Sequence, residues 1–305
     1  MMLIDELLID KTMMADWPSG ICQPEQGWDN SKPLLVILAS CHGRTLLTYF
    51  NMKPEFRSQF NIVRLETGPI YMREYAGEPV MTRPSMVRLL SEADVLVTYN
   101  MGDNHGSFSL SRIKPLLKSG CKIVTFAAPN FSAFWPVSGN YCGVLAVMNA
   151  LDRGKSEAEI HKDFDDGSFD PIFHLRWRIE MGRIEYRDKT HDVKLGDFIL
   201  RNHKTHKLFM SAGHPSFTTI AWLGSGVILA LGFPAEDESA VLAYDHAIDC
   251  MGKWPETDYE FNHYGFTYPK RYAKVETGGM EIYHELIRSA VKFSNEGGYC
   301  SIHMD

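Results

Sequence analysis

The sequence predicts an α/β protein, with an N-terminal parallel sheet flanked by helices and a mostly helical C-terminal half. Strand-like apolar runs alternate with helix-like segments from about residue 34 to 128, the pattern of a parallel sheet with helices on its faces. The run Leu34–Ala39 is apolar at every position, which is typical of a strand buried on both faces. Beyond Pro136 the segments favour helix. We therefore predict an N-terminal extension over 1–32, a sheet region over 33–136, and a helical region over 137–305 that packs on it as one compact unit.

Four strands and three helices are expected in the sheet region. The predicted strands are 34–39, 61–65, 94–99 and 122–127, and the helices between them are 45–50, 85–91 and 109–118. Ligands of an open parallel sheet bind outside the carboxyl ends of its strands. The loops that follow the strands are therefore the first places to look for a site.

The C-terminal half carries helix signals instead of strand signals. Ser156 and Glu159 have the spacing of a capping box, and Pro215 suits the first turn of a helix that runs to about Leu231. Further helices are predicted over 140–151, 239–251 and 279–294.

Composition narrows the class of protein. The 305 residues are 45% hydrophobic and 23% charged, as in an ordinary globular protein, and the net charge of -7 argues against binding a nucleic-acid backbone. The longest apolar stretch, Trp222–Phe233, is too short to span a membrane, and the N-terminus lacks the pattern of a signal peptide. Six scattered cysteines without a Cys-x-x-Cys pair indicate reduced thiols, so we expect a cytoplasmic protein.

Three loops rich in polar, aromatic and glycine residues follow the predicted strands. They are Ser40–Arg44, Asn100–His105 and Pro129–Pro136. In the first, Cys41 stands at a strand-to-helix turn, where helix N–H groups favour a thiolate or bind an oxyanion. The geometry is similar to a nucleophile elbow with cysteine in place of serine, but a small buried residue at a tight turn would give the same pattern. Arg44 could neutralise a phosphate or form a surface ion pair.

A second local feature is the segment Ser211–Ser216. Pro215 would aim His214 from a rigid point, so that His214 could act as a base toward Cys41 or bind a substrate hydroxyl. The alternative is a histidine that only caps the helix.

Two further patterns are weaker. The residues His191, His203 and His206 match no standard metal site, so we expect no metal. The residues Arg176, Arg183 and Arg187 share one helical face, where they could hold phosphates, although Glu180 beside them favours a solvated, ion-paired face.

In chain order, several of these segments resemble the WcbI-type capsular polysaccharide biosynthesis proteins. The resemblance covers roughly 34–233, and its most specific parts are the cysteine turn and the segment from Lys207 to Ser216. The segments that carry it are Ala39–Arg44, Glu92–Val97, Pro129–Asn130, Asp197–Asn202 and Lys207–Ser216. The family's turn usually reads Gly-Asn-Cys-Gln, whereas this chain has Ala-Ser-Cys-His.

The resemblance implies a coenzyme A-binding protein that transfers an acetyl group from acetyl-CoA to a sugar hydroxyl of a capsule or related polysaccharide. Cys41 and His214 are then the catalytic candidates, with Cys41 either carrying the acyl group or contributing its turn to the oxyanion site. The candidates for coenzyme binding are Ser40, His42, Gly43, Arg44, Asn104, Asn130, Arg176, Arg183 and Ser216. Two alternatives stay open: an SGNH-like esterase that uses the same cysteine turn and histidine, and a coenzyme A- or glycan-binding protein without chemistry of its own.

Overall fold

The chain divides into two units, each built from segments that are distant in sequence. The computed structural model describes residues 21–22, 29–68, 70, 74, 77, 81–82, 84–138, 141–248, 256–269 and 281–296. The first unit comprises the chain up to Ala128 together with Asp188–Lys194 and Ile220–Val241. The second comprises Pro129–Arg187, Leu195–Thr219 and the chain from Leu242 onward. The packing of the two halves as one compact unit stays a prediction.

The first unit is built on a five-stranded sheet with the order β1-β3-β2-β4-β5. Its strands are β1 (Ile21–Cys22), β2 (Leu34–Ala39), β3 (Asn61–Glu66), β4 (Val95–Thr98) and β5 (Lys122–Thr125). The last four are parallel, as the sequence predicts, while β1 pairs antiparallel with β3. The two residues of β1 lie in the predicted extension, where so short a strand leaves no periodic signal.

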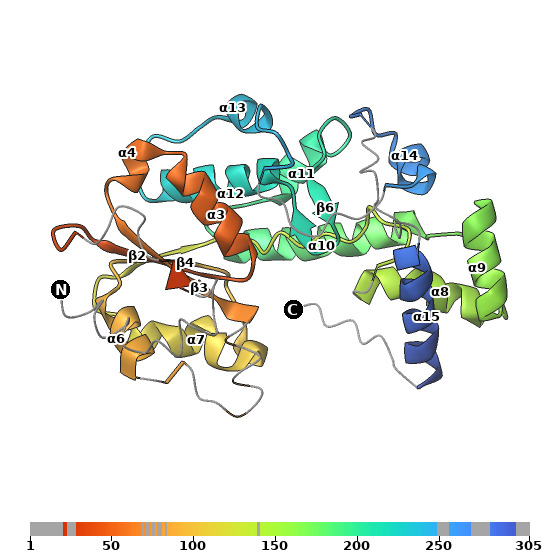
Figure 1. Ribbon diagram of the computed structural model, residues 1–305, viewed down its shortest axis with the longest axis horizontal. Coiled ribbons are helices and arrows are strands. Elements are labelled where there is room, and N and C mark those ends of the chain that lie inside the picture. Colours follow the sequence, from red (N-terminus) through yellow and green to blue (C-terminus); the bar gives the residue numbers. More distant parts are fainter. Residues whose placement is uncertain are drawn as a thin grey trace. The chain divides into compact units, whose positions relative to one another are not determined.

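Helices cover both faces of this sheet (Figure 1). On one side lie α3 (His42–Asn51), α4 (Pro54–Arg57) and α12 (Phe217–Ala230), and on the other α6 (Pro84–Glu92) and α7 (Leu110–Ile113). Two short 3-10 helices, η1 (Asp103–Phe108) and η2 (Lys114–Leu116), flank α7. The predicted helix 109–118 is therefore divided, because Pro115 lacks the N–H group that would continue the ladder of α7.

Alternate residues of the strands enter different cores. Leu34, Val36 and Leu38 of β2 belong to a cluster with Leu89 and Leu90 of α6. On the opposite face, Ile37 lies under α3, where a Cβ atom at Gly43 would meet it at 3.4 Å. Every residue of β2 is buried, which confirms the expectation of a strand covered on both faces.

Two glycines bring α12 close to its neighbours in the first unit. A Cβ atom at Gly224 would overlap the ring of Tyr49 on α3, and one at Gly226 would overlap Val193. The Gly-Ser-Gly sequence of α12 therefore serves packing, in agreement with its position within a helix.

The second unit is mainly helical. It contains α8 (Tyr141–Asp152), α9 (Glu157–Asp166), α10 (Phe173–Thr190), α11 (Gly196–Asn202), α14 (Asp258–Tyr264) and α15 (Glu281–Asn295), together with the strands β6 (Phe209–Ser211) and β7 (His214–Pro215). The ends of α10 and α12 cross into the other unit. The capping box of Ser156 and Glu159 is confirmed at the start of α9.

Two helix predictions in this half are wrong in extent. Pro215 pairs with Phe209 in a two-stranded sheet, so α12 starts at Phe217 and not at Pro215. A second helix is predicted over 239–251. Of its described residues, only those in α13 (Glu238–Leu242) are helical, and residues 249–251 lie outside the described part of the chain. For the predicted helix 279–294, α15 covers 281–295, while 279 and 280 lie outside the described residues.

Candidate functional site

A tight turn joins β2 to α3 and carries the predicted cysteine. The N–H group of Gly43 donates to the Ser40 carbonyl at 2.9 Å, and that of Arg44 donates to the Cys41 carbonyl at 3.0 Å. Cys41 is half-buried, and Arg44 is exposed on the first turn of α3. Gly43 is needed here for close packing, because a Cβ atom would lie 3.2 Å from that of Ala39. The predicted strand-to-helix turn at Cys41 is therefore confirmed.

A hydrogen-bonded group of three side chains surrounds this turn. The Nδ1 atom of His42 lies 2.6 Å from the Tyr99 hydroxyl and 3.1 Å from the Ser40 hydroxyl. The two hydroxyl oxygens lie 3.1 Å apart. His42 and Tyr99 are buried and Ser40 is half-buried. The structure thus brings Ser40 and His42, the two predicted residues beside Cys41, into contact with Tyr99, which is not among the predicted site residues.

The signal for Tyr99 was its position directly after β4, a strand that pairs with β2. The predicted strand 94–99 includes Tyr99, and a residue within a strand is not expected among the loop residues that bind a ligand. A side chain at the carboxyl end of a parallel strand belongs to the edge where ligands bind.

The electrostatic environment of Cys41 differs from the expectation of a stabilised thiolate. Burial raises the pKa of the Cys41 thiol, and the Glu66 carboxylate raises it further. Hydrogen bonds from Ser40 and from backbone groups at the helix start lower it, but burial has the larger effect. Glu66 ends β3 and pairs with the buried guanidinium of Arg64 at 2.9 Å. The backbone groups of the turn therefore favour a thiolate, as predicted, but burial outweighs them and the net shift of the Cys41 pKa is upward.

The loop after β4 contacts a histidine from a remote segment. The N–H group of Asn100 donates to His191 Nε2 at 3.1 Å. His191 Nδ1 lies 3.1 Å from the Thr190 hydroxyl oxygen. Asn104 lies in η1, and its side chain is outside the described residues.

Arg176 is fully buried in the second unit, contrary to the expectation of a solvated face. Its guanidinium donates to the carbonyl oxygens of Ser132 at 2.7 Å, Pro136 at 2.9 Å and Trp135. The side chain therefore organises the third predicted loop and has no exposed surface for a coenzyme phosphate. Arg183 fits the ion-paired alternative, since it lies 3.7 Å from Glu180.

His214 and Ser216 have different local roles. His214 Nδ1 lies 2.7 Å from the Ser211 hydroxyl across the β6–β7 pair, and burial lowers the pKa of this histidine. The hydroxyl of the buried Ser216 accepts a hydrogen bond from the N–H group of Thr219 at 3.3 Å at the start of α12. Ser216 is thus the cap, and the alternative of His214 as a helix cap is not what the structure shows.

The predicted residues form two groups. The first unit contains Ser40, Cys41, His42, Gly43, Arg44 and Asn104, and the second contains Asn130, Arg176, Arg183, His214 and Ser216. Within the described part of the chain, no group of three or more His, Cys, Asp or Glu side chains could hold a metal ion. No helix described here has the length and apolar character needed to cross a membrane.

The parallel strands β2 to β5 with helices on both faces, followed by a mainly helical half, define the class as an α/β protein. Residues 34–236 match the family model described as "Polysaccharide biosynthesis enzyme WcbI". The match covers about two thirds of the chain, which therefore belongs to the WcbI family of polysaccharide biosynthesis enzymes.

A solved WcbI structure has the same fold. It is similar with a TM-score of 0.52 at 14% identity, over 86% of this chain and 98% of that chain. It is described as a novel polysaccharide biosynthesis enzyme in its native form, without a disulfide bond between coenzyme A and a cysteine. A search of the curated proteins found no match.

Proposed function

We propose that this chain is a coenzyme A-dependent O-acetyltransferase that acts on a sugar hydroxyl in polysaccharide biosynthesis. One observation carries the proposal: a WcbI-family chain presents a half-buried cysteine at the first turn after a parallel strand. The description of the WcbI structure refers to a disulfide between coenzyme A and a cysteine of that protein. We assign the corresponding place near the coenzyme thiol to Cys41.

The cysteine turn suits the acyl end of the donor. The backbone N–H groups of Cys41 and His42, which lower the pKa of the thiol, can also stabilise negative charge that develops on the thioester oxygen. The raised pKa of Cys41 favours its thiol form. Of the two roles open to Cys41, we therefore favour a part in the oxyanion turn over an acyl-carrying nucleophile.

His214 is the proposed general base. Its lowered pKa keeps the imidazole neutral at pH 7, and when Nδ1 donates to Ser211, Nε2 carries the lone pair that accepts a proton. The acceptor hydroxyl gives its proton to Nε2 while its oxygen attacks the thioester carbon. The carbon–sulfur bond then breaks, and the imidazolium returns the proton to the coenzyme sulfur.

Of the arginines considered for the coenzyme phosphates, Arg44 has the best position. It is exposed one turn from Cys41, whereas Arg176 is enclosed by its three carbonyl partners. A guanidinium on this turn can bind phosphate through paired hydrogen bonds.

Calorimetric titration with coenzyme A and with acetyl-CoA tests the proposal. We expect micromolar binding that weakens in Arg44→Ala and is unchanged in the matched control Arg288→Ala, an exposed arginine on α15. His214→Ala should retain binding but lose acetyl transfer. Absence of binding at millimolar ligand would overturn the proposal.

Measuring the consumption of acetyl-CoA with and without a saccharide acceptor distinguishes the acetyltransferase from the two alternatives, an esterase and a binding protein without chemistry of its own. An acetyltransferase consumes it in proportion to an added saccharide acceptor, whereas an esterase releases acetate without one. A binding protein shows tight binding without turnover, and His214→Ala then changes nothing.

A further inference from the structure

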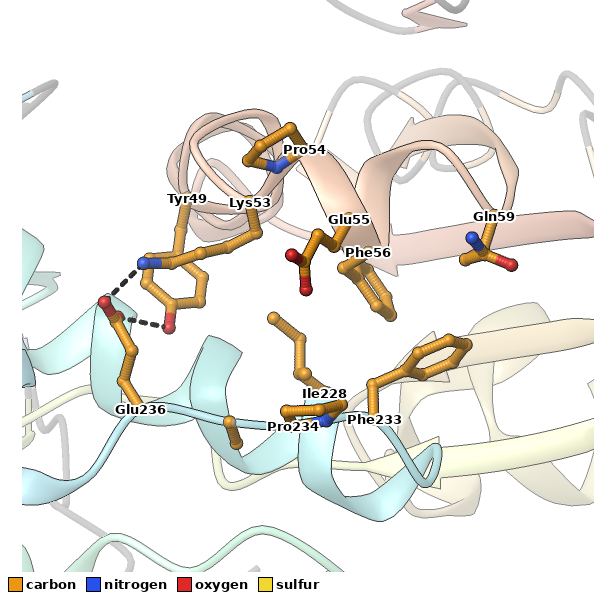
Figure 2. A pocket seen from close by; sticks show the side chains of 11 residues that line it. Tyr49, Lys53, Pro54, Glu55, Phe56, Gln59, Ile228, Phe233, Pro234 and Glu236 are labelled. Atoms are coloured by element: carbon orange, nitrogen blue, oxygen red, sulfur yellow. Dashed lines mark hydrogen bonds and ion pairs between the residues drawn. The ribbon is translucent and has the colours of Figure 1, made fainter.

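A separate pocket lies in the first unit, at the other end of α3 from the cysteine turn. Its volume is about 570 Å³, within the usual range of small-molecule sites. Residues of α3 and α4 line one side, and the end of α12 with the segment after it lines the other (Figure 2). Tyr49 in this pocket lies about 12 Å of helical rise beyond Cys41. No step of the proposed acyl transfer uses these residues.

Aromatic and aliphatic side chains form one wall of the pocket. Phe56 is buried, Phe233 is half-buried, and their rings meet edge to face with centroids 5.4 Å apart. The side chain of Ile228 lies beside them in Figure 2. Such a surface packs against the C–H face of a ring-shaped ligand.

Polar groups lie on the same pocket. Glu55 is exposed, and Figure 2 shows its carboxyl group directed into the space between α4 and the segment that carries Pro234. Among the described residues, none donates a hydrogen bond or ion pair to this carboxylate. Gln59 adds an exposed amide with both donor and acceptor atoms. These groups suit a ligand rich in hydroxyls.

The charge of the lining disfavours anions. Its charged side chains are Lys53, Glu55 and Glu236, so the net charge is negative. The Lys53 ammonium lies 2.5 Å from Glu236, which also accepts a hydrogen bond from the Tyr49 hydroxyl at 2.8 Å. A phosphate or a uronic acid would meet the Glu55 carboxylate without an unpaired cation from this lining to offset it.

We infer that this pocket binds an uncharged pyranose unit of the polysaccharide, as a subsite apart from the reacting centre. An apolar wall faces the C–H side of such a ring, and the carboxylate and amide meet its hydroxyls. The inference rests on the proposed function for the saccharide nature of the acceptor, but the pocket is distinct from the cysteine turn.

The test is calorimetric titration of the full chain with two sets of probes. One set contains neutral oligosaccharides of glucose, galactose, mannose and N-acetylglucosamine, and the other is an oligogalacturonate. We expect a neutral probe to bind, and Gln59→Ala and Phe233→Leu each to weaken it at least about fivefold. Glu285→Gln, at an exposed site on α15, serves as the control and should change nothing.

Three results would overturn the inference. They are no binding of any neutral probe at tens of millimolar, binding that is equal in both pocket variants and the control, and tighter binding of the oligogalacturonate. Coenzyme A titration of the same variants separates the two proposals. Loss of saccharide binding with coenzyme binding intact confirms the subsite, whereas absence of coenzyme binding in the unaltered chain affects the acetyltransferase alone.

Discussion

The Nδ1 atom of His42 lies 2.6 Å from the hydroxyl oxygen of Tyr99, and this bond joins the carboxyl ends of two neighbouring parallel strands. His42 lies three positions after the last residue of β2, and Tyr99 directly follows β4. The Ser40 hydroxyl oxygen also lies 3.1 Å from both His42 Nδ1 and the Tyr99 hydroxyl. Side-chain hydrogen bonds therefore connect the turn that carries Cys41 to the end of β4, in addition to the backbone pairing of β2 with β4.

Removing the Tyr99 hydroxyl should remove its hydrogen bonds to His42 and Ser40 and so lower the stability of the protein. We expect Tyr99→Phe to lower the free energy of unfolding by about 1 kcal/mol, since a buried imidazole nitrogen loses a hydrogen-bond partner. Urea denaturation measures the change. Tyr186→Phe, at an exposed tyrosine, is the matched control and should leave the free energy nearly unchanged. Equal stability of the two variants would contradict a structural role for the bond.

The thiol of Cys41 should react slowly at neutral pH. Burial and Glu66 raise its pKa, and the thiolate is the reactive form, so the rate of alkylation should rise with pH to a midpoint above the range of a free thiol. Iodoacetamide labelling followed by peptide mass spectrometry measures this, with the urea-unfolded chain as reference. Glu66→Gln should move the midpoint down. A folded-state midpoint at or below the unfolded one would show that the helix N-terminus outweighs burial.

Replacing Arg176 should cost stability directly. Arg176→Met leaves the carbonyls of Ser132, Trp135 and Pro136 without their buried donor, and we expect a loss of at least about 3 kcal/mol in urea denaturation. The control is Arg178→Met on the same helix, where the side chain is exposed. If Arg176→Met is as stable as the control but loses coenzyme affinity, the phosphate-binding role takes the place of the structural one.

Stability should also depend on the protonation of Glu260. Burial raises its pKa to about 8, although Thr257 donates two hydrogen bonds to the carboxylate and so lowers it in part. The folded-state pKa exceeds the unfolded one, so the stabilisation is complete below the unfolded value near 4.5 and is lost as the pH rises through about 8. Thermal unfolding should therefore show a melting temperature that falls between about pH 4.5 and about pH 8 and levels off above.

Glu260→Gln isolates this effect. Glutamine keeps the capping-box geometry with Thr257 but does not titrate, so the variant should show a smaller fall in melting temperature over the same range. Glu285→Gln, which is exposed, should keep the full slope. Parallel slopes in all three proteins would assign the pH dependence to other groups.

Local patterns predicted the sheet and its cysteine turn well. The strands β2 to β5 are short segments rich in aliphatic residues, and the turn at Cys41 follows from a strand end beside Gly43. The capping box at Ser156 is equally local. Each of these depends on neighbours within a few residues, which is the range in which propensity and periodicity act.

Errors arose where a distant segment changed a local preference. Pro215 suits a helix start, but its pairing with Phe209 places it in β7. The spacing of the arginines in α10 predicts an exposed face. Arg176 is buried instead, because its guanidinium donates hydrogen bonds to three carbonyl groups of a loop about forty residues earlier. Tertiary hydrogen bonds outweigh propensities of a few tenths of a kcal/mol per residue.

The amino-acid sequence by itself determined the α/β class, the order of the four parallel strands along the chain, the cysteine turn and the family resemblance, because these rest on local pattern and residue type. Only the tertiary structure decided that Tyr99 meets His42, that Glu66 and burial raise the pKa of Cys41, that Arg176 is enclosed, and that a pocket forms between α4 and the segment after α12. These features join residues that the chain separates by tens to more than a hundred positions. Their proximity and desolvation arise only when the segments pack.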